Sequence, residues 1–441
     1  MPQVKFENRI LDSTETLSAG ELQTLQTERL RRCVRQVMDV PFYREKFAEL
    51  KVTPEVIRSV DDVKRLPFTT KADLRDHYPL GFLAVPQDEV VRYHGSSGTT
   101  GKPTMVAYTA NDIKLWSNMC ARFLVAGGLQ RHHTAQVAFG YGLFTGGFGL
   151  HYGIEMVGAA IIPAASGNTK RQVMLMQDMR TDALICTPSY GLTIADYIKS
   201  ENIDPGTLNL KYAFFGGESW TEPMRETIEN DLQIFATNNY GLSEVIGPGV
   251  SGECLARNGM HLYEDHFFVE CLDPDTLEPV PDGEPGELVI TSMTREAMPV
   301  IRYRTRDIAR IYTEPCPCGR TFRRMGRVIG RSDDMLIIRG VNVYPSQIEE
   351  ALLQVEGSAP HYEIVLTRPK AMDEATVRVE IAPSHFSDKI ADMMILKDKI
   401  VAAIAQITGL HLHIELLPPN TLQRFEGKAK RVDDQRPLKV E

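Results

Sequence analysis

The sequence predicts an α/β protein, in which a large N-terminal domain of β-sheets flanked by helices is followed by a small α+β domain. The length of 441 residues suits two or three domains of ordinary size. Short apolar runs alternate with segments of helix length over most of the chain, which is typical of α/β architecture with substantially parallel sheets. From about Gly330 the pattern changes to closely spaced short strands. We therefore predict a large domain over 1–331 and a small domain over 332–441.

An amphipathic helix is predicted near the N-terminus. Ser18 and Glu21 have the spacing of a capping box, and apolar residues follow at near-helical intervals from Leu22 to Met38. Buried strands of the large domain are predicted at the apolar runs 136–139, 183–186, 212–215 and 288–290. In the small domain we predict strands at 335–338, 362–366, 377–381 and 412–416, and helices near 346–354 and 388–407. Ligands of such folds gather at the carboxyl ends of parallel strands, so we expect the site there.

Composition and charge exclude several classes of protein. Apolar residues make up 43% of the chain and charged residues 24%, as in an ordinary globular protein. The net charge of -9 argues against broad nucleic-acid binding, which needs a basic face. The segment Met1–Arg9 lacks the apolar core of a signal peptide, and no later apolar run approaches the length of a membrane span. We expect a cytoplasmic protein that binds neither nucleic acid nor membrane.

A glycine-rich loop at 93–104 is the strongest functional signal. It combines glycines, hydroxyl side chains and a lysine, and such a loop binds phosphate through backbone N–H groups, hydroxyls and positive charge. A kinase-type P-loop is excluded, because Pro103 follows Gly101-Lys102 and no glycine lies five residues before Gly101. The predicted phosphate-binding residues are Ser96, Ser97, Gly98, Thr99, Thr100, Gly101 and Lys102.

A cysteine and histidine cluster is a candidate metal site. Seven cysteines are an odd number, which argues against a disulfide framework. Cys316 and Cys318 flank a proline and precede a glycine, which favours a tight turn, and Cys254 and His261 lie upstream. Together these side chains form the donor set of a closed structural zinc site. The alternative is four unligated side chains, because the spacings are unusual for a zinc finger.

The glycine-rich loop resembles the Ser-Gly-Thr-Thr-Gly-Lys-Pro loop of the adenylate-forming enzymes, a superfamily of acyl-CoA synthetases, luciferases and adenylation domains. Further segments carry the resemblance in the expected order. The segment 238–244 is similar to the Tyr-Gly-x-x-Glu motif, which implies that Glu244 lies near the Mg²⁺ bridging ATP phosphates. The nucleotide-binding residues implied beside it are Asn239, Tyr240 and Gly241.

Two other segments resemble adenosine-binding motifs of this superfamily. Gly216, Gly217 and Glu218 match the segment that flanks the adenine. Asp307 matches the aspartate that accepts hydrogen bonds from both ribose hydroxyls. Arg306 stands where the common motif has glycine, and this departure is similar to the phenylacetate–CoA ligase branch.

A hinge and a catalytic lysine follow from the resemblance of the C-terminal segments. The match at 330–345 implies that Arg331 reaches the nucleotide, that Asp333 is the pivot of a mobile small domain, and that Gly340 lies on the path of the thiol. The match at 426–431 implies that Lys428 offsets the repulsion between the carboxylate and the α-phosphate, with Lys430 as the second candidate.

The resemblance implies a two-step ligase. ATP, Mg²⁺ and a carboxylic acid give an acyl-adenylate and pyrophosphate, and coenzyme A then takes the acyl group and releases AMP. The expected partners are an aryl acid, ATP, CoA and a second copy of the chain in a homodimer. A carrier-protein phosphopantetheine is the alternative acceptor. A non-catalytic nucleotide-binding protein is a further alternative, which predicts damaged motifs, whereas Lys428, Glu244 and Asp307 are present.

The aryl pocket is predicted at a glycine-spaced aromatic segment. Phe139, Tyr141 and Phe144, together with Gly216, match the positions where the resembling branch binds its acid. Burying a phenyl ring contributes roughly 2–3 kcal/mol, which separates aryl acids from acetate. Phenylacetate is the first candidate, with indoleacetate, hydroxyphenylacetate and aminobenzoates as alternatives. The aromatic side chains have plain core packing as their alternative role.

Overall fold

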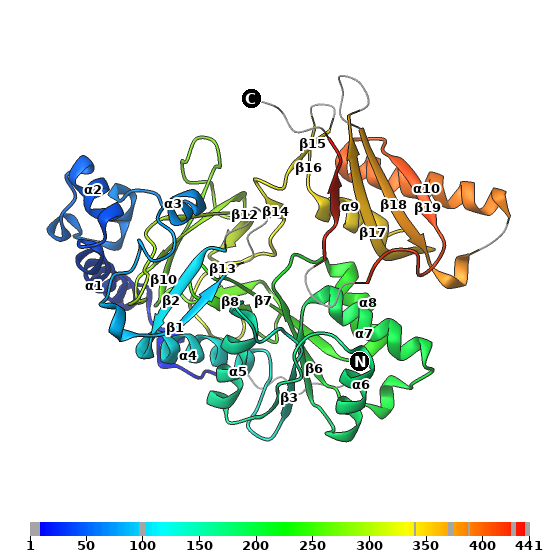
Figure 1. Ribbon diagram of the computed structural model, residues 1–441, viewed down its shortest axis with the longest axis horizontal. Coiled ribbons are helices and arrows are strands. Elements are labelled where there is room, and N and C mark those ends of the chain that lie inside the picture. Colours follow the sequence, from blue (N-terminus) through cyan, green and yellow to red (C-terminus); the bar gives the residue numbers. More distant parts are fainter. Residues whose placement is uncertain are drawn as a thin grey trace.

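The computed structural model describes residues 9–96, 103–338, 341–368, 374–386, 389–424 and 429–436. Figure 1 shows two bodies of unequal size. The larger carries the elements up to β14 and the smaller carries β15 to β20 with helices α9 and α10. A large α/β domain followed by a small α+β domain was predicted, and this fold is confirmed. The boundary between residues 331 and 332 stays a prediction.

Helices form the N-terminal part of the large domain. Ser18 caps α1 (Ala19–Val37) in the predicted box, since its side chain accepts from the Glu21 N–H while Glu21 accepts from the Ser18 N–H. The apolar face of α1 packs into the main core. The other elements of this part are η1 (Ser13–Thr16), α2 (Pro41–Leu50), η2 (Pro54–Val56), η3 (Val60–Arg65), α3 (Lys71–Asp76) and η4 (Gln87–Glu89).

A sheet of twelve strands runs through the large domain in the order β10-β11-β12-β13-β9-β8-β7-β6-β5-β3-β4, with β14 beside β12. Neighbours are parallel from β4 to β7 and antiparallel from β7 to β10, so the predicted parallel architecture holds for only part of the sheet. The parallel strands are β3 (Thr134–Val137), β4 (Ala160–Ile162), β5 (Ala183–Cys186), β6 (Tyr212–Gly216) and β7 (Phe235–Leu242). The remaining strands are β8 (Gly247–Glu253), β9 (Met260–Leu262), β10 (Phe267–Leu272), β11 (Pro285–Ser292), β12 (Tyr303–Tyr312), β13 (Arg324–Met325) and β14 (Gly330–Arg331).

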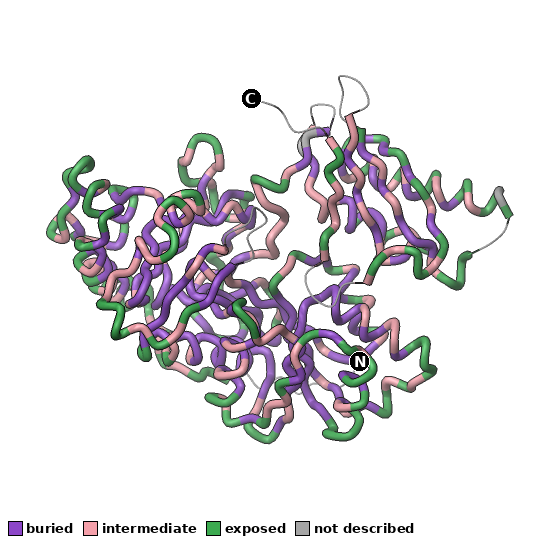
Figure 2. Tube along the Cα trace, in the orientation of Figure 1, coloured by how far each residue is buried: buried purple, intermediate pink, exposed green. Residues whose placement is uncertain are grey.

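The parallel part of the sheet separates two hydrophobic cores. Successive side chains of a strand point to opposite faces, so Ile185 joins one core while Leu184 joins the other. Figure 2 shows these buried strands in purple at the centre of the large body. A separate hairpin pairs β1 (Val90–Gly95) with β2 (Met105–Thr109). The helices that follow are α4 (Ala110–Ala126), α5 (Gly146–Val157), α6 (Thr169–Asp178), α7 (Pro188–Ser200) with η5 (Pro205–Thr207), and α8 (Glu222–Leu232).

The small domain has its own sheet and core. Its strands follow the order β19-β18-β17-β20, and both helices contribute to one apolar cluster with the sheet. The elements are β15 (Leu336–Ile338), β16 (Val341–Val343), α9 (Pro345–Leu353), β17 (Ser358–Thr367), β18 (Glu374–Ile381), η6 (Pro383–His385), α10 (Ile390–Thr408), β19 (His413–Leu417) and β20 (Val432–Asp434). The predicted strands and helices of this domain are present, whereas β20 was not predicted. Among the residues described, no helix has the length and apolarity needed to cross a membrane.

Candidate functional site

The carboxyl ends of β6 and β7 bring two predicted segments together. β6 ends at Gly216 beside Asn239 of β7, and the Asn239 side chain donates to the Phe215 carbonyl at 2.7 Å. A Cβ at Gly216 would lie 2.6 Å from the Asn239 carbonyl oxygen, so only glycine fits. Gly217 has a φ of +85°, in the region that favours glycine. The segments predicted to flank the adenine and the metal therefore lie together at the carboxyl ends of these two neighbouring strands.

The predicted ribose-binding aspartate is held from two sides. Asp307 on β12 is buried, and its Oδ2 accepts a hydrogen bond of 2.7 Å from the Tyr240 hydroxyl. Its Oδ1 accepts from Arg331 at 3.1 Å, since β12 pairs with β14. Arg331 also binds both oxygens of Asp333, at 2.8 and 3.0 Å. Tyr240, Asp307, Arg331 and Asp333 thus form one chain from the sheet to the predicted hinge.

Glu244 is a buried carboxylate with a cationic neighbour. Its side chain is 5% exposed, and the ammonium of Lys71 lies 3.1 Å from its Oε1. Arg295 donates to the Glu244 and Val245 carbonyls, both at 2.8 Å, and stacks over Tyr108. A buried carboxylate offers the hard oxygen ligand that Mg²⁺ prefers, so Glu244 fits the metal.

Lys71 was not assigned from the sequence. It is the first residue of α3, which Thr70 and Asp73 cap in a box: the Thr70 hydroxyl accepts from the Asp73 N–H and the Asp73 carboxylate accepts from the Thr70 N–H. The capping box is a signal in the sequence for where α3 begins. It gives no signal that Lys71 meets Glu244, because the two residues lie far apart in the chain.

Glu218 joins the large and small domains. Its Oε1 accepts a hydrogen bond of 2.6 Å from the Ser189 N–H at the start of α7. Its Oε2 accepts one of 3.0 Å from the Ala429 N–H of the small domain. Ala429 directly follows the predicted catalytic Lys428 in the sequence. The chain beside the predicted lysine is therefore fixed next to the segment predicted to flank the adenine.

The three aromatic residues of the predicted pocket differ in burial. Phe139 and Tyr141 are half-buried. The Phe139 ring lies between Gly146 and Gly217, since a Cβ added at these glycines would be 3.4 and 3.6 Å from it, respectively. The Tyr141 hydroxyl lies 3.2 Å from His151 Nδ1, and burial raises the pKa of this tyrosine. Phe144 is 52% exposed, so it does not share their packing.

A buried histidine ties the aromatic segment to the phosphate loop. His94 Nδ1 donates to the Leu143 carbonyl at 3.1 Å, and the Gly95 N–H donates to the same oxygen at 2.9 Å. The His94 ring packs against Tyr108, Trp116 and Phe148. Sequence reasoning did not assign His94, because its partner lies 49 residues away.

The same aromatic cluster holds the loop that follows Glu244. The Tyr108 hydroxyl donates to the Ile246 carbonyl, and the Trp116 indole N–H donates to the Pro248 carbonyl, both at 2.8 Å. The phosphate loop, the aromatic segment and the Glu244 loop therefore meet at one set of rings.

Several predicted residues lie outside the part of the chain that the structure describes. These are Ser97, Gly98, Thr99, Thr100, Gly101 and Lys102 of the phosphate loop, together with Gly340 and Lys428. At the edge of the loop, Ser96 is buried and its N–H donates to the Thr104 carbonyl at 2.9 Å. Gly241 is half-buried, whereas Lys430, which follows Ala429, is exposed.

The four predicted zinc ligands come together. Cys254, His261, Cys316 and Cys318 are buried, and their ligand atoms all lie within 4.8 Å of one another. The Sγ atoms of Cys254 and Cys316 are 3.7 Å apart, close to the separation of about 3.8 Å that tetrahedral zinc with sulfur at about 2.3 Å requires. The hydrogen bond between Cys254 and Cys318 lowers the pKa of Cys318 and raises the pKa of Cys254. The geometry and the donor set fit a structural Zn²⁺.

Comparison with protein families and curated proteins gives matches over nearly the whole chain. Residues 33–295 match the model of AMP-binding enzymes, and residues 340–436 match that of the AMP-binding enzyme C-terminal domain. A phenylacetate-coenzyme A ligase of Thermus thermophilus is 48% identical, over 96% of this chain and 98% of that protein. The phenylacetate-coenzyme A ligases of Pseudomonas putida and Escherichia coli are 46% and 45% identical, over 98% and 97% of this chain and 98% of each relative.

Solved structures include a relative captured in more than one state. A 2-hydroxyisobutyryl-CoA ligase in its postadenylation state, bound to R3-HIB-AMP, aligns with a TM-score of 0.90 and 29% identity, over 98% of this chain and 95% of that one. The same ligase in its thioesterification state, bound to 2-HIB-AMP and CoA, aligns with a TM-score of 0.71 over the same shares of both chains. The two domains of this chain are therefore arranged more like the postadenylation structure.

Proposed function

Since this chain belongs to the AMP-binding enzyme family and is an AMP-forming acid–CoA ligase, we propose that its acid is phenylacetate. One structural observation above all supports the activation of the acid. Glu244 follows β7, Asp307 binds Tyr240 on β7, and Ala429 binds Glu218 just after β6, so three separate segments meet near the carboxyl ends of these two strands. This is the arrangement that an ATP-dependent activation of a carboxylic acid needs.

In the first step, an oxygen of the acid attacks the α-phosphorus of ATP. A new oxygen–phosphorus bond forms, the bond to the bridging oxygen breaks, and pyrophosphate leaves with that electron pair. Glu244 would hold Mg²⁺, which neutralises phosphate charge when bound. Asp307 would accept from the ribose hydroxyls, and Lys428 would offset the repulsion between the carboxylate and the α-phosphate. The protein chiefly aligns the reactants and neutralises charge.

In the second step, the CoA thiolate attacks the acyl carbon and AMP leaves as a phosphate anion. We propose that the small domain turns about Asp333 before this step, so that Lys428 withdraws and the Gly340 segment faces the thiol. Arg331, which binds both Asp307 and Asp333, supports a hinge at this place, because it links the nucleotide site to the first residues of the small domain.

The acid pocket is proposed at Phe139, Tyr141, Phe144 and Gly216. Phe139 lies beside Gly217, which supports an aryl group close to the adenylate site. The exposure of Phe144 suits a residue at the pocket entrance, where it would be covered when the acid binds. A pocket of this kind separates an aryl acid from acetate, whereas one methylene or ring substituent changes affinity by only about 1–3 kcal/mol. Another aryl acid is therefore the second candidate.

We also propose a structural zinc ion at Cys254, His261, Cys316 and Cys318. Four protein ligands without an open position would bind the loop after β8 to the turn before β13. Metal analysis of protein purified without added zinc tests this proposal. About one equivalent of zinc per chain, lost in the Cys318→Ser variant, would support it, and well under one equivalent would contradict it.

The central experiment measures pyrophosphate release from ATP and Mg²⁺ with aryl and aliphatic acids, each with and without CoA. Release with phenylacetate that CoA increases would support the proposed ligase and rank its acids. Release that CoA leaves unchanged would favour a carrier protein as the acceptor. No release with any acid would contradict the proposal. Sedimentation would test the proposed homodimer, and fractionation of the source cells the proposed cytoplasmic location.

A further inference from the structure

We propose that Asp196 is a positioning residue for acid activation, which holds the small domain over the site through His361 and Arg424. The inference rests on the proposed function, because it concerns the first of the two half-reactions. Asp196 touches neither nucleotide nor acid in this proposal. It acts by favouring one orientation of the domain that carries the predicted Lys428.

The contact crosses between the two domains. Asp196 lies on α7 of the large domain and His361 on β17 of the small one, 165 residues apart in sequence. His361 Nε2 and Asp196 Oδ2 are 2.8 Å apart, and Arg424 Nε lies 3.9 Å from the same oxygen. The His361 side chain is 12% exposed, while that of Asp196 is 43% exposed. One accessible carboxylate therefore meets two groups of the opposite domain.

Each partner of Asp196 is fixed within the small domain. Both terminal nitrogens of Arg424 bind Glu380 on β18, each at 2.8 Å. Glu380 is almost fully buried, and it also accepts from the Asn420 and Leu422 N–H groups. His361 belongs to β17, which pairs with β18. The contacts of Asp196 therefore reach β17 and β18, the two central strands of the small domain.

A second contact with the small domain is made by Glu218, which α7 holds in place. The Ser189 N–H at the start of α7 binds Glu218, which in turn accepts from the Ala429 N–H. Ser189 and Asp196 are seven residues apart, about 10 Å along a helix that rises 1.5 Å per residue. Arg424 and Ala429 flank the segment that contains Lys428. Both flanking residues thus contact the large domain: Arg424 contacts Asp196 on α7, and Ala429 contacts Glu218, which α7 binds.

These contacts belong to one of two domain orientations. The chain aligns with a TM-score of 0.90 to the relative in its postadenylation state and 0.71 to the same relative in its thioesterification state. A rotation of the small domain about Asp333 would carry His361 and Arg424 away from α7. The Asp196 contacts therefore favour the first orientation and are lost in the second.

The expected effect is a change in the ratio of the two half-reaction rates. If domain rotation is faster than chemistry, each half-reaction is proportional to the population of its own orientation. The ratio of the two rates then changes in proportion to the equilibrium constant between the two domain orientations, whichever orientation the wild-type protein favours. Removing one partly exposed, charged hydrogen-bonding group should lower the ratio of adenylation to thioesterification roughly three- to tenfold.

The test compares Asp196→Ala, Asp196→Asn and the matched control Glu201→Gln, an exposed acid at the end of the same helix. Adenylation is measured as ATP–pyrophosphate exchange, and thioesterification as thioester formation from supplied acyl-adenylate and CoA. The acid is whichever one the wild-type protein accepts, so failure of phenylacetate leaves this test intact. Asp196→Ala should lower the ratio, Asp196→Asn should restore part of it, and Glu201→Gln should leave it unchanged.

The partner side supplies an independent check. His361→Gln should lower the ratio in the same direction, and the double variant with Asp196→Ala should add little, because both changes remove one contact. Equal loss of both half-reactions in Asp196→Ala, or an unchanged ratio, would overturn the proposal. So would full additivity of the two substitutions.

Discussion

Single residues show how the proposed ribose site is arranged. Asp307 is buried and accepts from the Tyr240 hydroxyl and from Arg331. Burial and the neighbouring Asp307 carboxylate raise the pKa of Tyr240, so this hydroxyl stays protonated and donates. The Asp307 carboxylate is therefore held in one orientation, and the nucleotide meets a rigid acceptor.

Tyr240→Phe should weaken nucleotide binding. The substitution leaves a buried carboxylate oxygen without its hydroxyl donor, which costs about 1–3 kcal/mol. We expect the KM for ATP to rise roughly tenfold while kcat changes less, measured by pyrophosphate release. A KM that stays at the wild-type value would contradict this role of Tyr240.

Lys71→Met should destabilise the protein in the absence of nucleotide and Mg²⁺. The change leaves the buried Glu244 charge without its cation, which costs about 1–3 kcal/mol. The double variant Lys71→Met/Glu244→Gln is the matched control, because it removes both charges and should recover most of the loss. Urea unfolding of all three proteins measures the effect. Equal stability of the single variant and the wild type would rule out a stabilising Lys71–Glu244 pair.

Short motifs in the sequence predicted candidate site residues but not their distant contacts. Glu244, Asp307 and the four proposed zinc ligands were predicted in this way, and the structure brings Tyr240 to Asp307 and the cysteines to His261. Lys71 and His94 were not assigned, because each contacts a segment that is distant in sequence. A local sequence pattern gives no information about such tertiary contacts.

At the scale of elements, the pairing of β7 with β8 is irregular within the predicted metal segment. The register shifts between Tyr240 and Gly241. A Cβ at Gly241 would lie 2.0 Å from the Gly247 carbonyl oxygen. The two backbones therefore approach closely just before Glu244.

Gly241→Ala should therefore disturb both stability and activity. The methyl group cannot fit against backbone, so the strand must shift, which costs about 1–3 kcal/mol. Gly20→Ala is the control, since nothing lies within 4 Å of its added Cβ. The unfolding temperature and the rate of pyrophosphate release should both be lower in Gly241→Ala than in the wild type. Gly20→Ala should change neither. A Gly241→Ala protein with wild-type unfolding temperature would show that the backbones separate without cost.

Several elements with an apolar pattern were predicted, whereas β8 and β20, which lack one, were not. β5 and β6 are continuous apolar runs buried on both faces, as parallel strands are. β8 is rich in glycine and also contains proline, and β20 is polar, so neither shows the alternation of a strand. Their pairing is set by neighbouring strands. Strand order across the sheet likewise depends on contacts that no single segment records.

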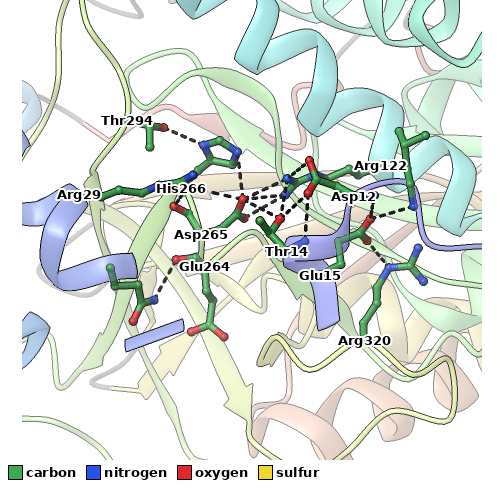
Figure 3. Close-up of polar contacts among 12 residues, drawn as sticks. Asp12, Thr14, Glu15, Arg29, Arg122, Glu264, Asp265, His266, Thr294 and Arg320 are labelled. Atoms are coloured by element: carbon green, nitrogen blue, oxygen red, sulfur yellow. Dashed lines mark hydrogen bonds and ion pairs between the residues drawn. The ribbon is translucent and has the colours of Figure 1, made fainter. Parts of the chain in front are cut away.

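At the scale of the molecule, a buried charge network ties the N-terminal segment to the large domain. Arg122 on α4 donates to both oxygens of Asp265, at 2.9 to 3.1 Å, and lies 2.8 Å from Asp12 (Figure 3). Beside it, Arg320 pairs with the fully buried Glu15. Arg320 follows the proposed zinc ligand Cys318 by two residues. The chain start, α4 and the proposed metal turn are thus held together.

Arg122→Met should lower the free energy of unfolding by about 3–5 kcal/mol, because it leaves Asp265 buried without its main cation. Burial opposes ionisation of Asp12, but hydrogen bonds and charge from Arg122 outweigh it and lower the pKa of Asp12. That stability is present above the ordinary carboxyl pKa and is lost as pH falls through the lowered one. Unfolding measured against pH should show a weaker acid dependence in the variant. A variant with the wild-type acid dependence would contradict the pairing.

Lys428→Ala should separate the two half-reactions. Adenylation should fall by at least about a hundredfold, because a charge placed between two anions is lost. Thioester formation from supplied acyl-adenylate should be retained, because the lysine has withdrawn by then. Lys430→Ala tests the second candidate for the catalytic lysine and should leave both steps nearly unchanged. Equal loss of both steps in Lys428→Ala would refute this division of labour.

The two-domain organisation was predictable, but the orientation of the domains was not. The change of pattern near Gly330 reflects a second core, which the structure shows. The orientation depends on pairs such as Asp196 with His361, and neither residue differs from an ordinary surface residue in the sequence.

The Leu143 carbonyl accepts from both Gly95 and His94, and this shared oxygen has a consequence for the order of substrate binding. If ATP bound at the predicted phosphate loop holds the aromatic segment in place through this oxygen, the acid that follows loses less conformational entropy on binding. By thermodynamic reciprocity, bound acid must increase the affinity for ATP by the same factor. The two substrates would then bind synergistically, and a site holding only one of them would be the rarer species.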